Sequence, residues 1–138
     1  MAIQLKVECR NARLDAIETY GSTSCALQVF TGAQPADCIT ANSGTMLVSM
    51  NLPADWLAAA ATGAKAKAGT WSGTAANGAG ATPGHFRIYN SQATKDGTTC
   101  FIQGSCAIGS GDINFDGTIT SGQTVTISTF TLTDANAE

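Results

Sequence analysis

Apolar and polar residues alternate along much of this chain, which is the pattern of strands with one buried face. Such period-two runs predict strands at residues 3–7, 25–31, 45–52, 85–90 and 98–105, and a shorter strand around Trp71. Turn-rich segments containing Gly, Pro, Asn and Asp separate most of these runs. The pattern therefore predicts a fold built mainly from short strands.

The alternation slips near the C-terminal end. Val125 and Ile127 share one face of a strand, whereas Phe130 and Leu132 have the opposite parity. Because strand side chains alternate strictly, the slip at residues 128–129 predicts a β-bulge or a strand that changes partners.

Two short helices are predicted between the strands. The first covers residues 11–20, with Asn11 as its N-cap and Gly21 directly after its end. The second covers residues 53–61, where Pro53 suits the first turn and Asp55 suits the positive end of the helix dipole. Helices this short must pack on the rest of the protein to be stable.

At 138 residues the chain has the length of one domain, which we assign to residues 1–138. About seven or eight strands, without a βαβ pattern or an internal repeat, favour an all-β fold. We expect an antiparallel β-sandwich of the jelly-roll type, with one or two short helices in its connections. The Ala/Gly-rich residues 65–83 are expected to form one long loop.

Charge is sparse, since Asp, Glu, Lys and Arg make up 12% of the residues, against about 25% in a typical domain. The surface is then either covered with uncharged polar side chains or partly buried against neighbouring subunits. A net charge of −3 with scattered basic residues argues against nucleic-acid binding. The chain has no apolar run long enough for a membrane span and no signal-peptide pattern, so we expect synthesis in the cytoplasm.

The five cysteines are Cys9, Cys25, Cys38, Cys100 and Cys106. Their number is odd, they form no CxxC pair, and a single histidine cannot complete a common zinc site. Buried thiols that act as small apolar groups are the favoured interpretation. The alternative is one or more disulfides, within or between subunits, formed in an oxidising medium.

One segment has the spacing of a calcium loop. Asp112, Asn114, Asp116 and Gly117 match the start of an EF-hand motif, but Gln123 stands where a bidentate Glu is needed. We therefore favour a strand followed by an Asp-Gly turn, and predict no metal site.

No catalytic site is predicted. His85 is the only imidazole, and its alternation with Phe86 places it beside Arg87 on a polar strand face. No nucleophile motif accompanies it, so the sequence predicts no catalytic residue, no cofactor and no enzymatic activity.

Five segments carry a resemblance that covers nearly the whole chain: RNARLDAIETYG, VFTGAQPADC, LPADWLAAAATGAKAKAGTW, GHFRIYNS and TVTISTFTLTD. They resemble small structural proteins of tailed bacteriophages and prophages. In size and β-rich character the chain is similar to capsid decoration (cement) proteins of this group. The resemblance implies a non-enzymatic protein on the outer capsid surface of the virion, where it clamps adjacent major capsid subunits.

The implied partners are the major capsid protein or other virion proteins, together with further copies of the chain in a dimer or trimer. An alternative is an accessory protein of the tail, collar or head fibre that recognises host surface glycans. Interface candidates are Trp56, Trp71, Lys65 and Lys67, with a place in the core as the alternative for both tryptophans.

Overall fold

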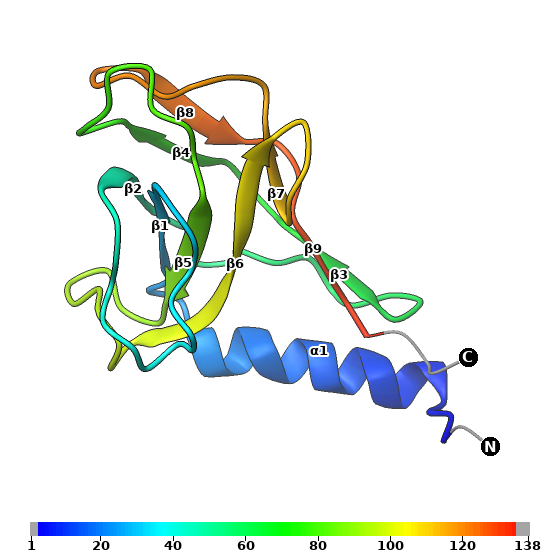
Figure 1. Ribbon diagram of the computed structural model, residues 1–138. Helices are drawn as coiled ribbons and strands as arrows, with labels where there is room; N and C mark the ends of the chain where they lie inside the picture. Colours follow the sequence, from blue (N-terminus) through cyan, green and yellow to red (C-terminus); the bar gives the residue numbers. More distant parts are fainter. Residues whose placement is uncertain (1–2, 135–138) are drawn as a thin grey trace.

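The computed structural model describes residues 3–134 and confirms a mainly β fold (Figure 1). Within these residues it has one helix, α1 (Val7–Gly21), at the N-terminal end. The strands are β1 (Ala26–Phe30), β2 (Met46–Asn51), β3 (Ala64–Ala66), β4 (Trp71–Thr74), β5 (His85–Tyr89), β6 (Cys100–Ile108), β7 (Ile113–Phe115), β8 (Thr124–Ile127) and β9 (Thr131–Thr133). No helix in the described part is both long and apolar enough to cross a membrane.

The main sheet has five strands in the order β2-β1-β5-β6-β7. Its pairs are antiparallel except β6–β7, which run parallel with Cys106 opposite Ile113. Only residues 109–112 connect these two strands, and the positive φ angles of Gly109 and Gly111 allow this tight reversal. Two small antiparallel sheets, β3–β9 and β4–β8, complete the β structure.

The strands predicted at residues 25–31, 45–52, 85–90 and 98–105 correspond to β1, β2, β5 and β6, and the strand around Trp71 corresponds to β4. The phase slip at residues 128–129 is a change of partner, as one of the two predictions stated. Before it, β8 pairs with β4, and after it, β9 pairs with β3. One C-terminal segment thus joins two small sheets.

The prediction of a helix at residues 53–61 is wrong. This segment is extended, and it pairs with residues 66–68 through the bonds Ala58 N to Ala66 O and Ala68 N to Trp56 O, both 2.8 Å. Consecutive Trp56 and Leu57 are both buried. A hairpin that turns at Thr62 and Gly63, both with positive φ angles, thus overrides the local helix signals.

The N-terminal prediction also needs correction. Residues 3–6 form no strand, and α1 begins at Val7, four residues before the predicted helix, although it ends at Gly21 as predicted. A helix satisfies its backbone groups within its own segment, whereas a lone alternating segment needs a neighbouring strand.

Residues 65–83 are not one long loop, because they contain most of β3 and all of β4. Trp71 opens β4 opposite Ile127 of β8, and Lys65 of β3 lies opposite Leu132 of β9. The strands that stabilise this small-residue stretch come from the C-terminal end of the chain.

Aromatic rings fill the centre of the core. The ring of Trp71 lies 6.2 Å from that of Trp56 and 5.2 Å from that of Phe130, which meets Phe86 edge-on at 5.7 Å. Offset and edge-on contacts of this kind add to the energy of burying the rings themselves. All five residues of β5 are buried, so this central strand is covered on both faces.

Candidate functional site

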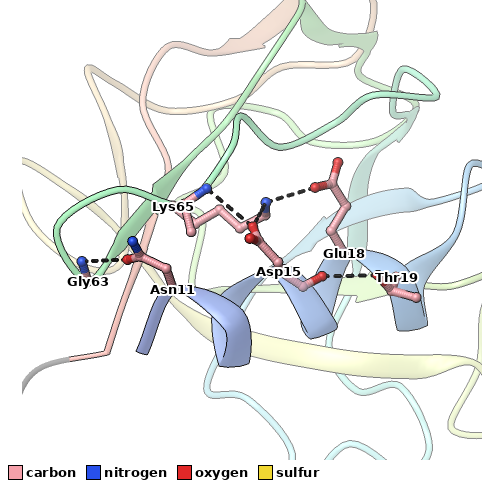
Figure 2. A network of polar contacts seen from close by, with 7 residues as sticks. Asn11, Asp15, Glu18, Thr19, Gly63 and Lys65 are labelled. Carbon is pink, nitrogen blue, oxygen red and sulfur yellow. Dashed lines mark hydrogen bonds and ion pairs between the residues drawn. The ribbon is translucent and has the colours of Figure 1, made fainter. Parts of the chain in front are cut away.

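Lys65, at the centre of β3, is almost completely buried, with 1% of its side chain exposed. Its Nζ lies 2.7 Å from Asp15 Oδ1 and 2.8 Å from Glu18 Oε2 (Figure 2). Both carboxylates lie on α1, three residues apart and therefore on the same helix face. We call Lys65, Asp15 and Glu18 the lysine clamp, because they join the helix to the small β3–β9 sheet.

Other polar contacts continue along α1 towards its N-terminal end. Asn11 Oδ1 accepts a 2.9 Å hydrogen bond from Gly63 N. Arg10 Nη1 donates to Asp134 O at 2.9 Å, and Arg13 Nε pairs with Asp134 Oδ2 at 3.1 Å. The helix thus meets the β3–β9 sheet mainly through charged and amide groups.

The clamp keeps its groups charged. Burial by itself lowers the pKa of Lys65, but the hydrogen bonds to Asp15 and Glu18 outweigh it, so the pKa is raised. The hydrogen bond from Lys65, helped by one from the Ala60 N–H, lowers the pKa of Asp15. A lysine is a nucleophile only when neutral, so Lys65 acts here as a charged anchor and not as a reactive amine.

A second polar cluster surrounds Arg87 on β5, which is fully buried. Its guanidinium donates to neutral acceptors on the β1–β2 connection and on β6: Asp37 O (3.4 Å), Cys38 O (2.6 Å), Thr40 O (2.9 Å), Asn42 Oδ1 (2.7 Å) and Cys100 Sγ (3.2 Å). Several hydrogen bonds offset the cost of burying this charge. Arg87 thereby fixes residues 31–45, the connection between β1 and β2, against the main sheet.

His85 shares a face of β5 with Arg87, opposite the core residue Phe86, as predicted, but this polar face is covered and the His85 side chain is fully buried. Its ring stacks on Phe30 at 5.0 Å, and its Nδ1 lies 2.9 Å from Gly32 O. Its Nε2 is buried and has no hydrogen-bond partner among the described residues. Burial is the main reason that its pKa is lowered. A buried imidazole without an orienting carboxylate is not placed to serve as a general base.

The calcium-like segment folds as the favoured interpretation stated, with β7 at its centre. Asp112 Oδ2 accepts bonds from Ser105 N and Oγ, both 2.8 Å, and Asn114 Oδ1 accepts from Gly109 N at 2.8 Å. These oxygens stabilise the β6–β7 connection. Across residues 3–134, no group of three or more His, Cys, Asp and Glu side chains has a metal-binding arrangement.

The predicted interface residues do not form a surface patch. Trp56 and Trp71 are fully buried, which agrees with their alternative place in the core. Lys65 belongs to the lysine clamp. Lys67 is half-buried, and its Nζ donates to Gly69 O at 2.7 Å and lies 5.7 Å from the centre of the Trp71 ring.

An apolar groove between α1 and β6 is the surface feature that the sequence did not reveal. Tyr20 is 66% exposed and its ring lies 5.5 Å from that of Phe101. The α1–β6 groove is lined by Ala16, Ile17, Tyr20, Cys100, Phe101 and Ile102. Gly21 fixes the helix end here, since an added Cβ would lie 2.8 Å from Phe101 and 2.9 Å from Trp56.

Sequence patterns indicated the lysine clamp and the α1–β6 groove only weakly. Asp15 and Glu18 have the spacing of a helix face, but no nearby residue pattern pairs them with Lys65.

Comparisons of the chain with protein-family models, with curated proteins and with solved structures found no match.

Proposed function

We propose that this chain is a non-enzymatic structural protein of a bacteriophage virion, a capsid decoration (cement) protein. It binds the outer capsid surface and clamps adjacent major capsid subunits. Part of this proposal is that its curled sheets form an antiparallel sandwich of the jelly-roll type. The sequence resemblance to phage structural proteins, over nearly the whole chain, supports this function.

The structural observation that carries the proposal is the α1–β6 groove. The exposed Tyr20 lies beside the half-buried Ile17, Phe101 and Ile102, and apolar patches at the surface mark protein contact sites. Tyr20 is an amphipathic side chain of the kind enriched at such contacts. Each copy needs only a modest contact, because many copies on one shell, or a dimer or trimer of the chain, add avidity.

Co-sedimentation with purified capsids that lack this protein tests the proposal. The wild-type chain should sediment with the shells, and Tyr20→Glu should weaken binding by roughly tenfold or more, since it places a charge in an apolar contact. Thr74→Glu is the matched control, because it adds the same charge at an exposed position of β4, away from α1 (Figure 1). Wild-type protein that does not bind shells would refute the cement function, and equal binding of both variants would refute the role of the groove.

A polar depression supports the second candidate, a tail, collar or head-fibre module that recognises host glycans. It is lined by hydroxyl, amide and carboxylate side chains: Asp116, Thr118, Gln123, Thr124, Thr126 and Ser128. Such groups can exchange hydrogen bonds with sugar hydroxyls. Copy number separates the two functions, because hundreds of copies per particle fit cement and a handful at the tail or collar fits recognition.

A further inference from the structure

We propose that Cys38 and Cys100 form a reversible disulfide that locks residues 31–45 onto the start of β6 in an oxidising medium. Cys38 lies in the β1–β2 connection and Cys100 is the first residue of β6. Arg87 bridges them, with Nη2 donating to Cys38 O at 2.6 Å and Nε donating to Cys100 Sγ at 3.2 Å. The inference does not depend on the proposed virion function.

Two further contacts hold the same pair of segments together. Asn42 Nδ2 donates to Lys95 O at 2.9 Å. An added Cβ at Gly97 would lie only 2.2 Å from Ile39 O, so the two backbones are in direct contact there. The segments that carry Cys38 and Cys100 are therefore packed together before any covalent bond forms.

The surroundings of the two thiols differ. Burial raises the pKa of Cys100 to about 11; the Arg87 guanidinium acts in the opposite direction, and a hydrogen bond with Cys38 adds to the rise. Cys38 is only half-buried, so a small oxidant can reach it. The pair thus combines an accessible thiol with a buried partner beside a cation that favours the thiolate.

The other cysteines differ in ways that make them useful references. Burial raises the pKa of Cys25 and of Cys106 to about 12 each, and Cys25 Sγ donates to Gly21 O at 3.0 Å. Both are buried and neither contacts Arg87, so they lie outside the Cys38–Cys100 cluster. Cys9 is exposed, but it lies on α1, outside the cluster around Arg87.

The chemistry is thiol–disulfide exchange with a low-molecular-weight disulfide such as oxidised glutathione. The Cys38 thiol loses its proton and attacks one glutathione sulfur, which forms a mixed disulfide and releases one reduced glutathione. The Cys100 thiolate then attacks Cys38 Sγ, which forms the Cys38–Cys100 bond and releases the second glutathione. Two protein thiols are oxidised, one small disulfide is reduced, and both protons end on the released thiols.

The test treats the folded, fully reduced protein with oxidised glutathione, alkylates the remaining thiols after denaturation, and maps the peptides by mass spectrometry. A Cys38–Cys100 cross-linked peptide is expected, with the other three cysteines free of cross-links. The melting temperature should rise by about 5–10 °C, because the bond closes a long loop, and dithiothreitol should reverse the rise.

Two variants sharpen the result. Cys100→Ser should stop at the mixed disulfide on Cys38 with no rise in melting temperature, whereas Cys9→Ser should form the cross-link as the wild type does. Circular dichroism checks that both are folded. The proposal is overturned if the wild type keeps glutathione on Cys38 while Cys100 is alkylated, or if the cross-links join two chains.

Discussion

Apart from the Lys67 ammonium over one side of its ring, Trp71 is surrounded by aromatic and aliphatic side chains. By contrast, α1 is held against the β3–β9 sheet by carboxylates, a lysine, arginines and an amide. In α1 only Leu14 and Gly21 are buried. The aromatic core is stabilised by burial, which depends little on pH or salt. The helix depends on ion pairs, which respond to both. The comparison indicates that the helix can loosen under conditions that leave the core intact.

Removing a core ring should have the largest effect. Trp71→Ala leaves a cavity among Trp56, Phe130 and Ile127 and should lower the free energy of unfolding by about 3–5 kcal/mol. That is a large share of the roughly 5–15 kcal/mol of a typical domain. Urea unfolding followed by circular dichroism measures it. A loss below about 1 kcal/mol would contradict the central place of this ring.

Breaking the lysine clamp should have an intermediate effect. Lys65→Met keeps most of the aliphatic stem but removes the charge, so the free energy of unfolding should fall by about 1–3 kcal/mol, as for hydrogen bonds to charged groups. Asp15 and Glu18 are 53% and 26% exposed and can then be hydrated. Lys6→Met is the matched control, because it removes an exposed lysine next to the start of α1 whose ion pair with Glu8 is open to solvent, and it should change stability by less than about 0.5 kcal/mol.

Acid should act on the helix through Asp15. Because its folded pKa lies below the ordinary value of 3.8, its contribution to stability is complete above that value and is lost as the pH falls through the folded pKa. Lys65 has a raised folded pKa, so its contribution is kept below 10.5 and is lost at still higher pH. Urea midpoints between pH 2 and 5 should therefore depend on pH less steeply in Asp15→Asn than in the wild type. Equal slopes would count against the clamp.

The smallest effect concerns His85, the one titrating imidazole within the core. Its folded pKa is lowered, so its contribution is present above about pH 6.5 and is lost as the pH falls through the folded value. His85→Phe keeps a ring against Phe30 and should abolish the part of the pH dependence between pH 5 and 7. Urea midpoints at these two pH values measure it, and an unchanged dependence would assign it to another group.

Most strands could be predicted from the sequence by local alternation, although the alternating residues 3–7 form no strand. The change of parity between Val125 and Phe130 predicted either a bulge or a change of partner, and the structure has the change of partner. The helix predicted at residues 53–61 failed because this segment folds back on residues 66–68 in a hairpin that turns at residues 62–63, whereas the prediction followed the helix-start residues Pro53 and Asp55. The alternation placed His85 on the same face of β5 as Arg87, but it could not show that residues 31–45 cover this face and bury both side chains.

The sites were harder to predict than the strands. Asp15 and Glu18 have the usual look of a solvated helix face, and Lys65 stands in an Ala-rich stretch that suggested a loop. Only the folded chain brings the three together. The same holds for Cys38 and Cys100, which are far apart in the sequence and meet through Arg87. Contacts between residues far apart in the sequence leave no local pattern from which they could be predicted.

Hydrogen exchange of the backbone amides, compared between the wild type and Lys65→Met at pH 7, tests most directly whether the helix and the core are stabilised separately. The amides of α1 should exchange roughly 10–100-fold faster in the variant, while those of β1 and β5 change little, because local opening of the helix leaves the aromatic core closed. Equal acceleration in α1, β1 and β5 would contradict the account, because it would show that the helix and the core open as a single unit.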